Sequence, residues 1–276
     1  MSFTRHLPRA SLQGLVDSLW CLEAAADAPM QSVLPDGCPE WVFQLASPYA
    51  QLQPDGSWLP QGQRLLVGQQ LQPVALRPLG PVRCLGVHFE PAGLAAWMGG
   101  DLRRFTGRIE DLDWALGLDL RGLSQTLAAM PQPQALEALQ DWLETLPRRP
   151  PDPRLTQAVQ ALSGRPLAEL PALAAELGWS ERQLRRRFEA AVGLGPKRFQ
   201  RLVRFQRVFA QAREHEAQAW VEAALDGGYC DQAHFSREVR TFCGASPREL
   251  LRELSPLTAH FLSLSDFSKT AAAARR

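Results

Sequence analysis

The hydrophobic pattern of the first part of the chain predicts strands. Up to about residue 90, short apolar runs alternate with turn residues, which is typical of small antiparallel strands. The candidate strands are Leu19–Glu23, Gln31–Leu34, Glu40–Leu45, Arg64–Gly68, Val74–Leu79 and Val82–Phe89. Pro35-Asp36-Gly37 and Pro54-Asp55-Gly56 supply reversals, since proline fixes φ and glycine accepts a positive φ. So many short strands in one segment predict a small β-barrel or a sandwich.

From Pro91 onward the apolar residues recur at three- and four-residue steps, which predicts helices. Pro91–Met98 forms a short helix, and Leu120, Leu123 and Leu127 share one stripe of a second. A third helix carries the stripe Leu136, Leu139, Trp142, Leu143 and Leu146. Such stripes either cap the core of the strands or form a dimer seam, and the periodicity allows both interpretations.

Four prolines between Pro147 and Pro153 predict an extended, stiff linker, because proline cannot sustain a helix interior. We therefore divide the chain into an N-terminal domain (1–146), a proline-rich linker (147–154), a helical domain (155–254) and a tail (255–276). The helices expected beyond the linker are Leu155–Leu162, Leu167–Leu177, Glu181–Ala191, Pro196–Arg213, Ala219–Leu225, Asp231–Phe242 and Pro247–Leu254. The predicted fold class is α+β with two domains, a small β-barrel with flanking helices and an all-α domain.

Two segments of the helical domain share one plan. The first runs from Leu173–Leu177 through Gly178-Trp179-Ser180 into a helix beginning at Glu181. The second runs from Val221–Leu225 through Gly228-Tyr229-Cys230 into a helix beginning at Asp231. In each, a glycine ends the first helix, an aromatic packs into the angle, and Ser180 or Asp231 can cap the second helix. This plan predicts two helix-turn-helix units.

The second helix of each unit, called the reading helix below, has an apolar and a polar face. Leu184, Phe188 and Ala191 point inward in the first, and Phe235, Val239 and Phe242 occupy the same slots in the second. The outward residues are Arg182, Arg185 and Arg186 in the first helix and Ala233, Ser236, Arg237 and Arg240 in the second. A helix that enters the major groove needs an apolar face that packs on the protein and outward donors for guanine edges and phosphates. The alternative is that these arginines only form a solvated surface.

The intervening helix, Pro196–Arg213, links the two units. At 1.5 Å per residue it is about 27 Å long, so it can hold two reading helices roughly 34 Å apart, which is one duplex turn. Its outer side carries Arg201, Arg204 and Arg207. These side chains either contact phosphates or form a solvated face.

Charge agrees with this division of the chain. The net charge of +1 combines residues 1–147, with 9 basic and 15 acidic side chains, and residues 148–276, with 21 basic and 14 acidic ones. The first part is therefore −6 and the second +7. Such an asymmetry suggests that one module meets nucleic acid and the other does not.

Residues 155–254 resemble the DNA-binding domain of the AraC/XylS family of bacterial transcription regulators. The matching stretches are LAAELGWSERQLRRRFEAAVGLGP, RLVRFQRV and GGYCDQAHFSREVRTFCGASPRELL. The resemblance implies seven helices with paired helix-turn-helix units, in which outward positions contact bases. Those positions here are Arg182, Arg185, Arg186, Gln232, Ala233, Ser236 and Arg237. Ala223 and Gly227 depart from the family pattern, which predicts a less rigid second unit.

The N-terminal part is similar to the cupin-like sensor domain of some of these regulators. The similarity lies in LPDGCPEWVFQL at 34–45 and GVHFEPAG at 86–93. It implies a small β-barrel followed by helices, with a small-molecule effector whose class and ligand residues stay unknown.

We expect no catalytic residue, no cofactor and no metal. His88 and Glu90 share one face of a predicted strand, but His6, His215, His234 and His260 are distant in sequence, so His88 is better explained as a hydrogen-bonded strand residue. Asp36, Cys38 and Glu40 beside a turn could line a barrel mouth, although Asp36 and Gly37 are more simply turn residues. The five cysteines contain no C-x-x-C pair and predict neither disulfides nor a zinc ribbon.

The sequence therefore predicts a DNA-binding transcription regulator that reads two successive major grooves of double-stranded DNA. No apolar run is long enough for a membrane helix and the N-terminus lacks a secretory core, so we expect a cytoplasmic, nucleoid-associated protein. Expected partners are a small-molecule effector, a second copy of the chain and, for an activator, RNA polymerase. The alternatives are a cupin-type metalloenzyme fused to a DNA-binding domain and a DNA-architectural protein without sequence preference.

Overall fold

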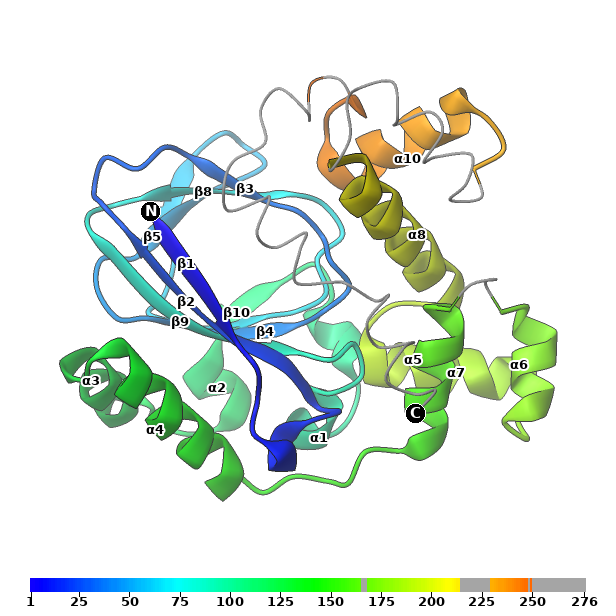
Figure 1. Cartoon of the computed structure of the whole chain (residues 1–276), viewed down its shortest axis with the longest axis horizontal. Coiled ribbons are helices and arrows are strands. Elements are labelled where there is room, and N and C mark those ends of the chain that lie inside the picture. Colours follow the sequence, from blue (N-terminus) through cyan, green and yellow to red (C-terminus); the bar gives the residue numbers. More distant parts are fainter. Residues whose placement is uncertain (165–167, 214–228, 248, 250–276) are drawn as a thin grey trace.

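A computed structural model describes residues 1–164, 168–213, 229–247 and 249. Its strands all lie within the first 111 residues, and the described elements beyond the linker are helices (Figure 1). The molecule thus has the predicted α+β class, with a β-rich N-terminal part and a helical C-terminal part. Among the described residues, no helix is long and apolar enough to cross a membrane.

The strands form two antiparallel sheets. The larger has the order β1-β2-β9-β4-β7-β10 and the smaller β3-β8-β5-β6. Their bounds are β1 Ser2–His6, β2 Val16–Ala24, β3 Gln31–Val33, β4 Glu40–Gln44, β5 Tyr49–Leu52, β6 Trp58–Pro60, β7 Arg64–Val67, β8 Val74–Pro78, β9 Val82–Phe89 and β10 Ile109–Asp111. In this N-terminal part, all of which is described, the sheets are not joined into a closed barrel. The predicted barrel is therefore not confirmed, and the sandwich alternative describes the strands better.

The larger sheet buries both of its faces. Trp20, Val42 and Cys84 pack toward the smaller sheet, whereas their chain neighbours Trp41 and Leu85 face a second core. That second core lies under the helices, and Figure 1 shows α3 and α4 on the side of the larger sheet away from the smaller one. The elements that follow β9 are α1 Ala95–Met98, η2 Leu102–Phe105, α2 Leu112–Leu116, α3 Arg121–Ala129 and α4 Gln132–Thr145.

The apolar stripe of α4 belongs to this core. Leu139 and Leu143 are fully buried and Leu136 nearly so. The capping interpretation of the stripe is therefore confirmed, and the alternative of a dimer seam is not supported. The other two members of the stripe, Trp142 and Leu146, are half-buried against the same core.

Five helices of the C-terminal part are described: α5 Pro153–Leu162, α6 Leu170–Glu176, α7 Glu181–Val192, α8 Pro196–Arg213 and α10 Gln232–Cys243. Helix α5 begins two residues inside the predicted linker, because the Asp152 carboxylate accepts from the Arg154 N–H at 2.9 Å and Pro153 suits a first turn. The predicted segments Ala219–Leu225, nearly all of Pro247–Leu254 and 255–276 lie outside the described residues.

Within the described residues, hydrogen bonds and apolar contacts join the two parts of the molecule. At the end of α7, the Thr106 hydroxyl donates to the Gly193 carbonyl at 2.7 Å, and Gly193 adopts a positive φ of 86°. On α8, the buried Gln206 amide donates to the Pro35 carbonyl. Leu34 and Cys38 of the N-terminal part lie in the same apolar cluster as the helices. The N-terminal part is therefore packed directly against the helices that carry the reading faces.

Candidate nucleic-acid interface

The first helix-turn-helix unit is formed by α6, a tight turn and α7. Gly178 has a φ of 67°, which lets the chain leave α6 in the left-handed region. Trp179 then packs into the angle and is 8% exposed. The Ser180 hydroxyl accepts from the Gln183 N–H while the Gln183 side chain accepts from the Ser180 N–H, which forms a capping box. The predicted turn, aromatic and N-cap of the first unit are confirmed.

Helix α7 separates its two faces as predicted. Leu184, Phe188 and Ala191 are buried, whereas Arg182, Arg185 and Arg186 are exposed on the opposite side. The next residue, Arg187, is also exposed, and its guanidinium lies 5.1 Å from the Trp179 ring. The outward face of α7 thus offers three guanidinium groups on a rigid, well-rooted helix.

Helix α8 connects the two reading helices (Figure 1). Near its start, Phe199 packs on Phe188 of α7 with ring centroids 5.4 Å apart. Further along, Phe205 packs on Phe242 of α10 at 5.3 Å. One helix therefore holds α7 at one end and α10 toward the other through aromatic pairs, which agrees with its predicted role as a rod.

Helix α10 repeats the pattern of α7. The Asp231 carboxylate accepts from the His234 N–H at 2.6 Å, so Asp231 is the predicted N-cap. Phe235, Val239 and Phe242 are buried as expected. Outward lie Gln232, Ala233, Arg237 and Arg240, all exposed, with Ser236 half-buried. The first helix of this unit, Val221–Leu225, and the glycine Gly228 fall outside the described residues, so the second unit as a whole stays a prediction.

A buried carboxylate under α10 was not predicted. Glu238 is 2% exposed and accepts from the Arg201 Nε at 2.6 Å, from an Arg204 Nη2 at 3.1 Å and from the Tyr229 hydroxyl at 2.8 Å. On a helical wheel Glu238 falls beside Phe235 and Phe242, inside the apolar stripe. A carboxylate in such a position has to be paired with a cation or with donors, and this is the sequence feature that could have revealed the network.

This network includes Arg204, for which the sequence predicted a phosphate contact. Its side chain is only 16% exposed and lies over the Tyr229 ring at 4.4 Å. Burial raises the pKa of the Tyr229 hydroxyl far above its usual value, so the group stays a neutral donor to Glu238. Arg204 therefore joins α8 to α10 inside the protein, which argues against its predicted phosphate contact. Arg207 likewise donates to the Gly164 carbonyl at 3.0 Å.

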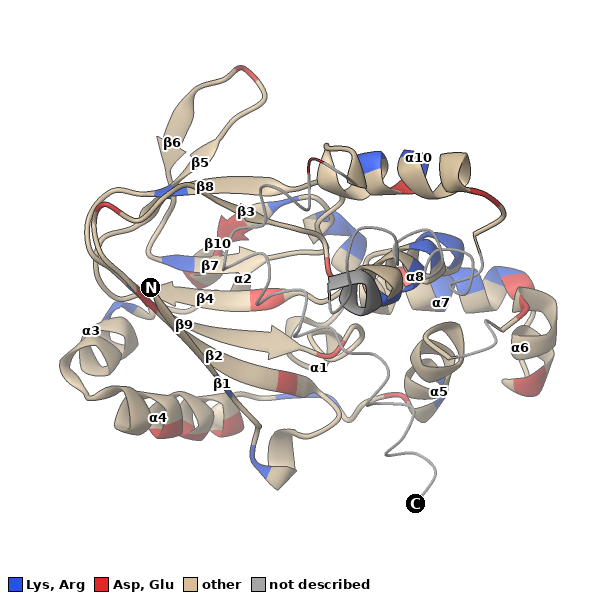
Figure 2. Ribbon diagram, turned by 45° about the horizontal axis from the view of Figure 1, so that its top comes forward, with Lys and Arg blue, Asp and Glu red and all other residues tan. Residues whose placement is uncertain are grey.

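Basic residues gather over α7, α8 and α10, as Figure 2 shows, whereas α4 carries acidic ones. On α4, Glu137, Asp141 and Glu144 surround Arg9 of the N-terminal part. The predicted charge asymmetry thus has a spatial counterpart, with the reading helices on the basic side of the molecule.

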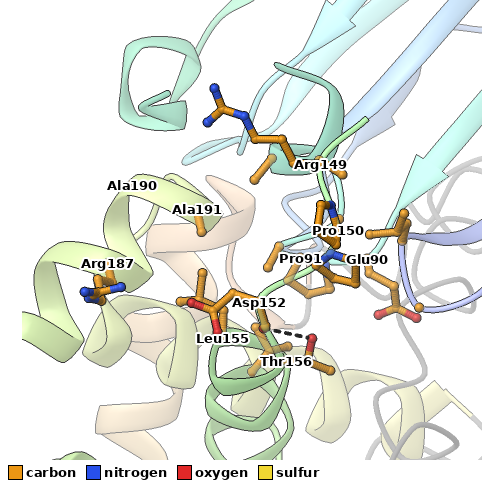
Figure 3. Close-up of a pocket in the computed structure, with 18 of the residues that line it drawn as sticks. Glu90, Pro91, Arg149, Pro150, Asp152, Leu155, Thr156, Arg187, Ala190 and Ala191 are labelled. Atoms are coloured by element: carbon orange, nitrogen blue, oxygen red, sulfur yellow. Dashed lines mark hydrogen bonds between the residues drawn. The ribbon is translucent and has the colours of Figure 1, made fainter. Parts of the chain in front are cut away.

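A cavity of about 370 Å³ lies between the two parts of the molecule. Its walls come from the segment after β9, from the linker and from α5 and α7. Figure 3 shows Arg149 and Arg187 at one side and Glu90 at the other. Burial and the neighbouring Asp17 raise the pKa of Glu90 to about 7. The space between the two sheets is far smaller, about 70 Å³, and is below the size of ordinary ligand pockets.

His88 is fully buried and hydrogen-bonded, as the sequence predicted. Its Nδ1 lies 3.1 Å from an Asp17 oxygen and its Nε2 lies 2.8 Å from an Asp36 oxygen. Asp36 also accepts from the Cys38 N–H at 3.0 Å. It therefore both stabilises the turn and binds His88. The sequence prediction that discounted a metal counted only histidines, and it missed that the turn brings Asp36 and Cys38 to His88.

Comparison with known proteins gives two family matches. Residues 173–253 match the family described as "Helix-turn-helix domain", and residues 4–111 match a "Domain of unknown function (DUF6597)". No match was found among curated proteins.

Among solved structures, ToxT from Vibrio cholerae is similar to the chain at 9% identity and a TM-score of 0.46, covering 92% of this chain and 100% of ToxT. ToxT bound to a methylnaphthalenyl butenoic acid gives 9% identity, the same coverage and a TM-score of 0.47. ToxT bound to an unsaturated fatty acid gives 10% identity, 92% and 96% coverage and a TM-score of 0.46. Similarity at this level does not transfer the ligands of ToxT to this chain. The motifs and the two family matches identify the chain as an AraC-type helix-turn-helix protein with an N-terminal domain of the DUF6597 family.

Proposed function

We propose that the protein is a sequence-specific transcription regulator whose α7 and α10 enter successive major grooves of DNA. The observation that carries this proposal is the outward face of α7, where three exposed arginines stand on a buried apolar root. An exposed guanidinium fork can bind the O6 and N7 atoms of guanine together. The helix-turn-helix match over residues 173–253 supports the same role.

The base contacts are assigned to the outward residues of both reading helices, all exposed except the half-buried Ser236. These are Arg182, Arg185 and Arg186 on α7 and Gln232, Ala233, Ser236 and Arg237 on α10. Arg240, one turn further along α10, is exposed and suited to a phosphate. The role of α10 depends on the same template as α7, namely an N-cap, an apolar root and an outward arginine.

The cavity between the two parts is the proposed effector site. A molecule bound there would touch the segment after β9, the linker and α7 at once. It would therefore favour one packing of the N-terminal part against the reading helix over others. The chain is assigned no reaction, since its family matches point to a regulator rather than to an enzyme.

The proposal is tested by selecting binding sites from the genome and measuring affinity for the selected duplex and for a random duplex at the same salt concentration. A specific regulator binds its own site with an affinity roughly 10³-fold or more above its affinity for random DNA. Equal affinities would instead identify a DNA-architectural protein and overturn the proposal. If Arg185→Ala keeps the wild-type ratio of the two affinities, the assignment of base contacts to α7 would be wrong.

A further inference from the structure

A buried cluster of ionisable groups lies at one end of the larger sheet, beside the helical part. His88 of β9 is paired in register with Glu40 of β4 and with Ser18, next to Asp17, on β2. The turn from Pro35 to Cys38 closes over this end of the sheet. The cluster thus combines an imidazole, a thiol and several carboxylates in a place with almost no contact with solvent.

Three potential ligand atoms converge in this cluster. A carboxylate oxygen of Asp36, the Sγ of Cys38 and a ring nitrogen of His88 all lie within 4.8 Å of one another. The His88 Nε2 is 2.8 Å from Asp36 and 4.0 Å from the Glu40 Oε1. Asp36 and Cys38 are 9% and 7% exposed, and His88 is fully buried. The geometry is therefore that of a compact interior site with three donors and a fourth within reach.

The other ring nitrogen of His88 is already oriented. Its Nδ1 faces Asp17, whose carboxylate also accepts from the Arg5 guanidinium at 2.8 Å and from the Ser18 hydroxyl at 2.8 Å. Histidines that bind metals almost always donate their second ring N–H to a carboxylate, a backbone carbonyl or a water, which fixes the tautomer and the ring plane. Asp17 supplies this partner and leaves Nε2 pointing toward Asp36 and Cys38.

The electrostatics of the cluster favour a cation. Carboxylate oxygens of Asp17, Asp36 and Glu40 all lie within 4.0 Å of the His88 ring nitrogens, and Arg5 is paired with Asp17. Buried carboxylates that outnumber their cationic partners are costly, and a divalent ion bound among them would offset that cost.

We propose that Asp36, Cys38 and His88 bind a zinc ion, with Glu40 as the fourth ligand. Thiolate, imidazole and carboxylate are the ligands that tetrahedral Zn²⁺ takes in proteins. Ligand atoms in such a site are about 3.3–3.8 Å apart, so the 2.8 Å Asp36–His88 hydrogen bond opens by about 0.5 Å when the ion binds. Binding releases the protons held by the thiol and by the His88 Nε2.

The ion would act on a segment that contacts the reading half of the molecule. The Pro35 carbonyl accepts from Gln206 of α8, and Cys38 lies in the apolar cluster of the helices. A movement of this turn therefore changes the surface on which α8 rests. This regulatory consequence rests on the proposed function, whereas the metal site does not.

The test uses the full-length protein, stripped with a chelator and titrated with Co²⁺ as a spectroscopic probe for Zn²⁺. We expect one equivalent of Co²⁺ to give a thiolate-to-cobalt charge-transfer band and visible bands of tetrahedral intensity, and both to disappear when Zn²⁺ is added. No binding at stoichiometric concentration would overturn the proposal and leave the cluster as an imidazole–carboxylate network.

The variants locate the site. Cys38→Ser should abolish the charge-transfer band, and Asp17→Asn should keep the band while weakening the metal affinity about 10–100-fold. Cys230→Ser is the matched control, because Cys230 is exposed in the helical part and its loss should change nothing. A band that survives in Cys38→Ser would assign the metal to other residues. Asp36→Asn, checked by circular dichroism, provides a second ligand variant should Cys38→Ser fail to fold.

Discussion

The two reading helices share one template and differ in what lies beneath them. Under α7 the root is wholly apolar, formed by Leu184, Phe188 and Ala191. Under α10 the root also contains Glu238, which holds Arg201 and Arg204 of α8. Arginines that look alike in sequence therefore have different surroundings, since Arg182, Arg185 and Arg186 of α7 are exposed whereas Arg201 and Arg204 of α8 are paired with Glu238. A count of basic residues overstates the surface available to a polyanion.

The largest expected effect is on the buried carboxylate. Glu238→Ala should lower the free energy of unfolding by about 3–5 kcal/mol, because it removes the buried carboxylate that accepts from Arg201 and Arg204. Urea unfolding measures this loss. The matched control is Glu189→Ala on α7, whose carboxylate is 28% exposed and lies 3.9 Å from Arg103; it should cost less than about 1 kcal/mol. Equal losses of unfolding free energy in the two variants would show that the residues beneath α7 and α10 do not differ in this way.

The next effect distinguishes Arg204 from a phosphate contact. Arg204→Ala should lower the free energy of unfolding by about 1.5–3 kcal/mol, the usual contribution of hydrogen bonds to charged groups. A phosphate contact would instead weaken binding to all DNA sequences alike and flatten the salt dependence. If Arg204→Ala leaves the free energy of unfolding unchanged but makes DNA affinity depend less steeply on salt, Arg204 contacts a phosphate after all.

The base contacts come third. Arg185→Ala on α7 and Arg237→Ala on α10 should each lower specific DNA affinity by about 1–3 kcal/mol and leave urea unfolding unchanged. The paired measurement compares the two helices directly. Should only Arg185→Ala lose specificity, α10 would contribute backbone contacts alone.

The smallest effect concerns the helix caps. Ser180→Ala and Asp231→Ala should each cost about 1 kcal/mol, measured by thermal unfolding. Ser180 takes part in a reciprocal capping box, whereas Asp231 accepts a single N–H bond from His234. A larger loss of stability for Ser180→Ala would show that the reciprocal bond of the capping box adds to the stability of the helix. A larger loss for Asp231→Ala would show that the single bond of the charged cap is the stronger one.

Local patterns predicted the elements well where side chains repeat along one face. The range Pro196–Arg213 agrees with α8 at both ends, and Ser180 and Asp231 are the caps that the sequence indicated. Strand β1, with the sequence SFTRH, was missed because it is a largely exposed edge strand without an apolar run. Strand β6 was missed because it is three residues long and ends in proline.

Contacts between distant segments could not be predicted in the same way. Whether two sheets close into a barrel depends on pairing between edge strands, which periodicity does not encode. The neighbours of His88 could not be predicted for a related reason, since Asp36 is 52 residues away in the chain and 2.8 Å away in space. The free or paired state of Arg204 was likewise decided by a carboxylate 34 residues away.

Gly193 ends α7 at a point where the N-terminal part already touches it. A side chain there would meet the Thr106 hydroxyl at 3.0 Å and Gln69 at 3.3 Å, besides requiring a left-handed backbone. Any larger residue would therefore push the N-terminal part away from the end of α7. The absence of a side chain at Gly193 sets how closely the two parts of the molecule can approach each other there.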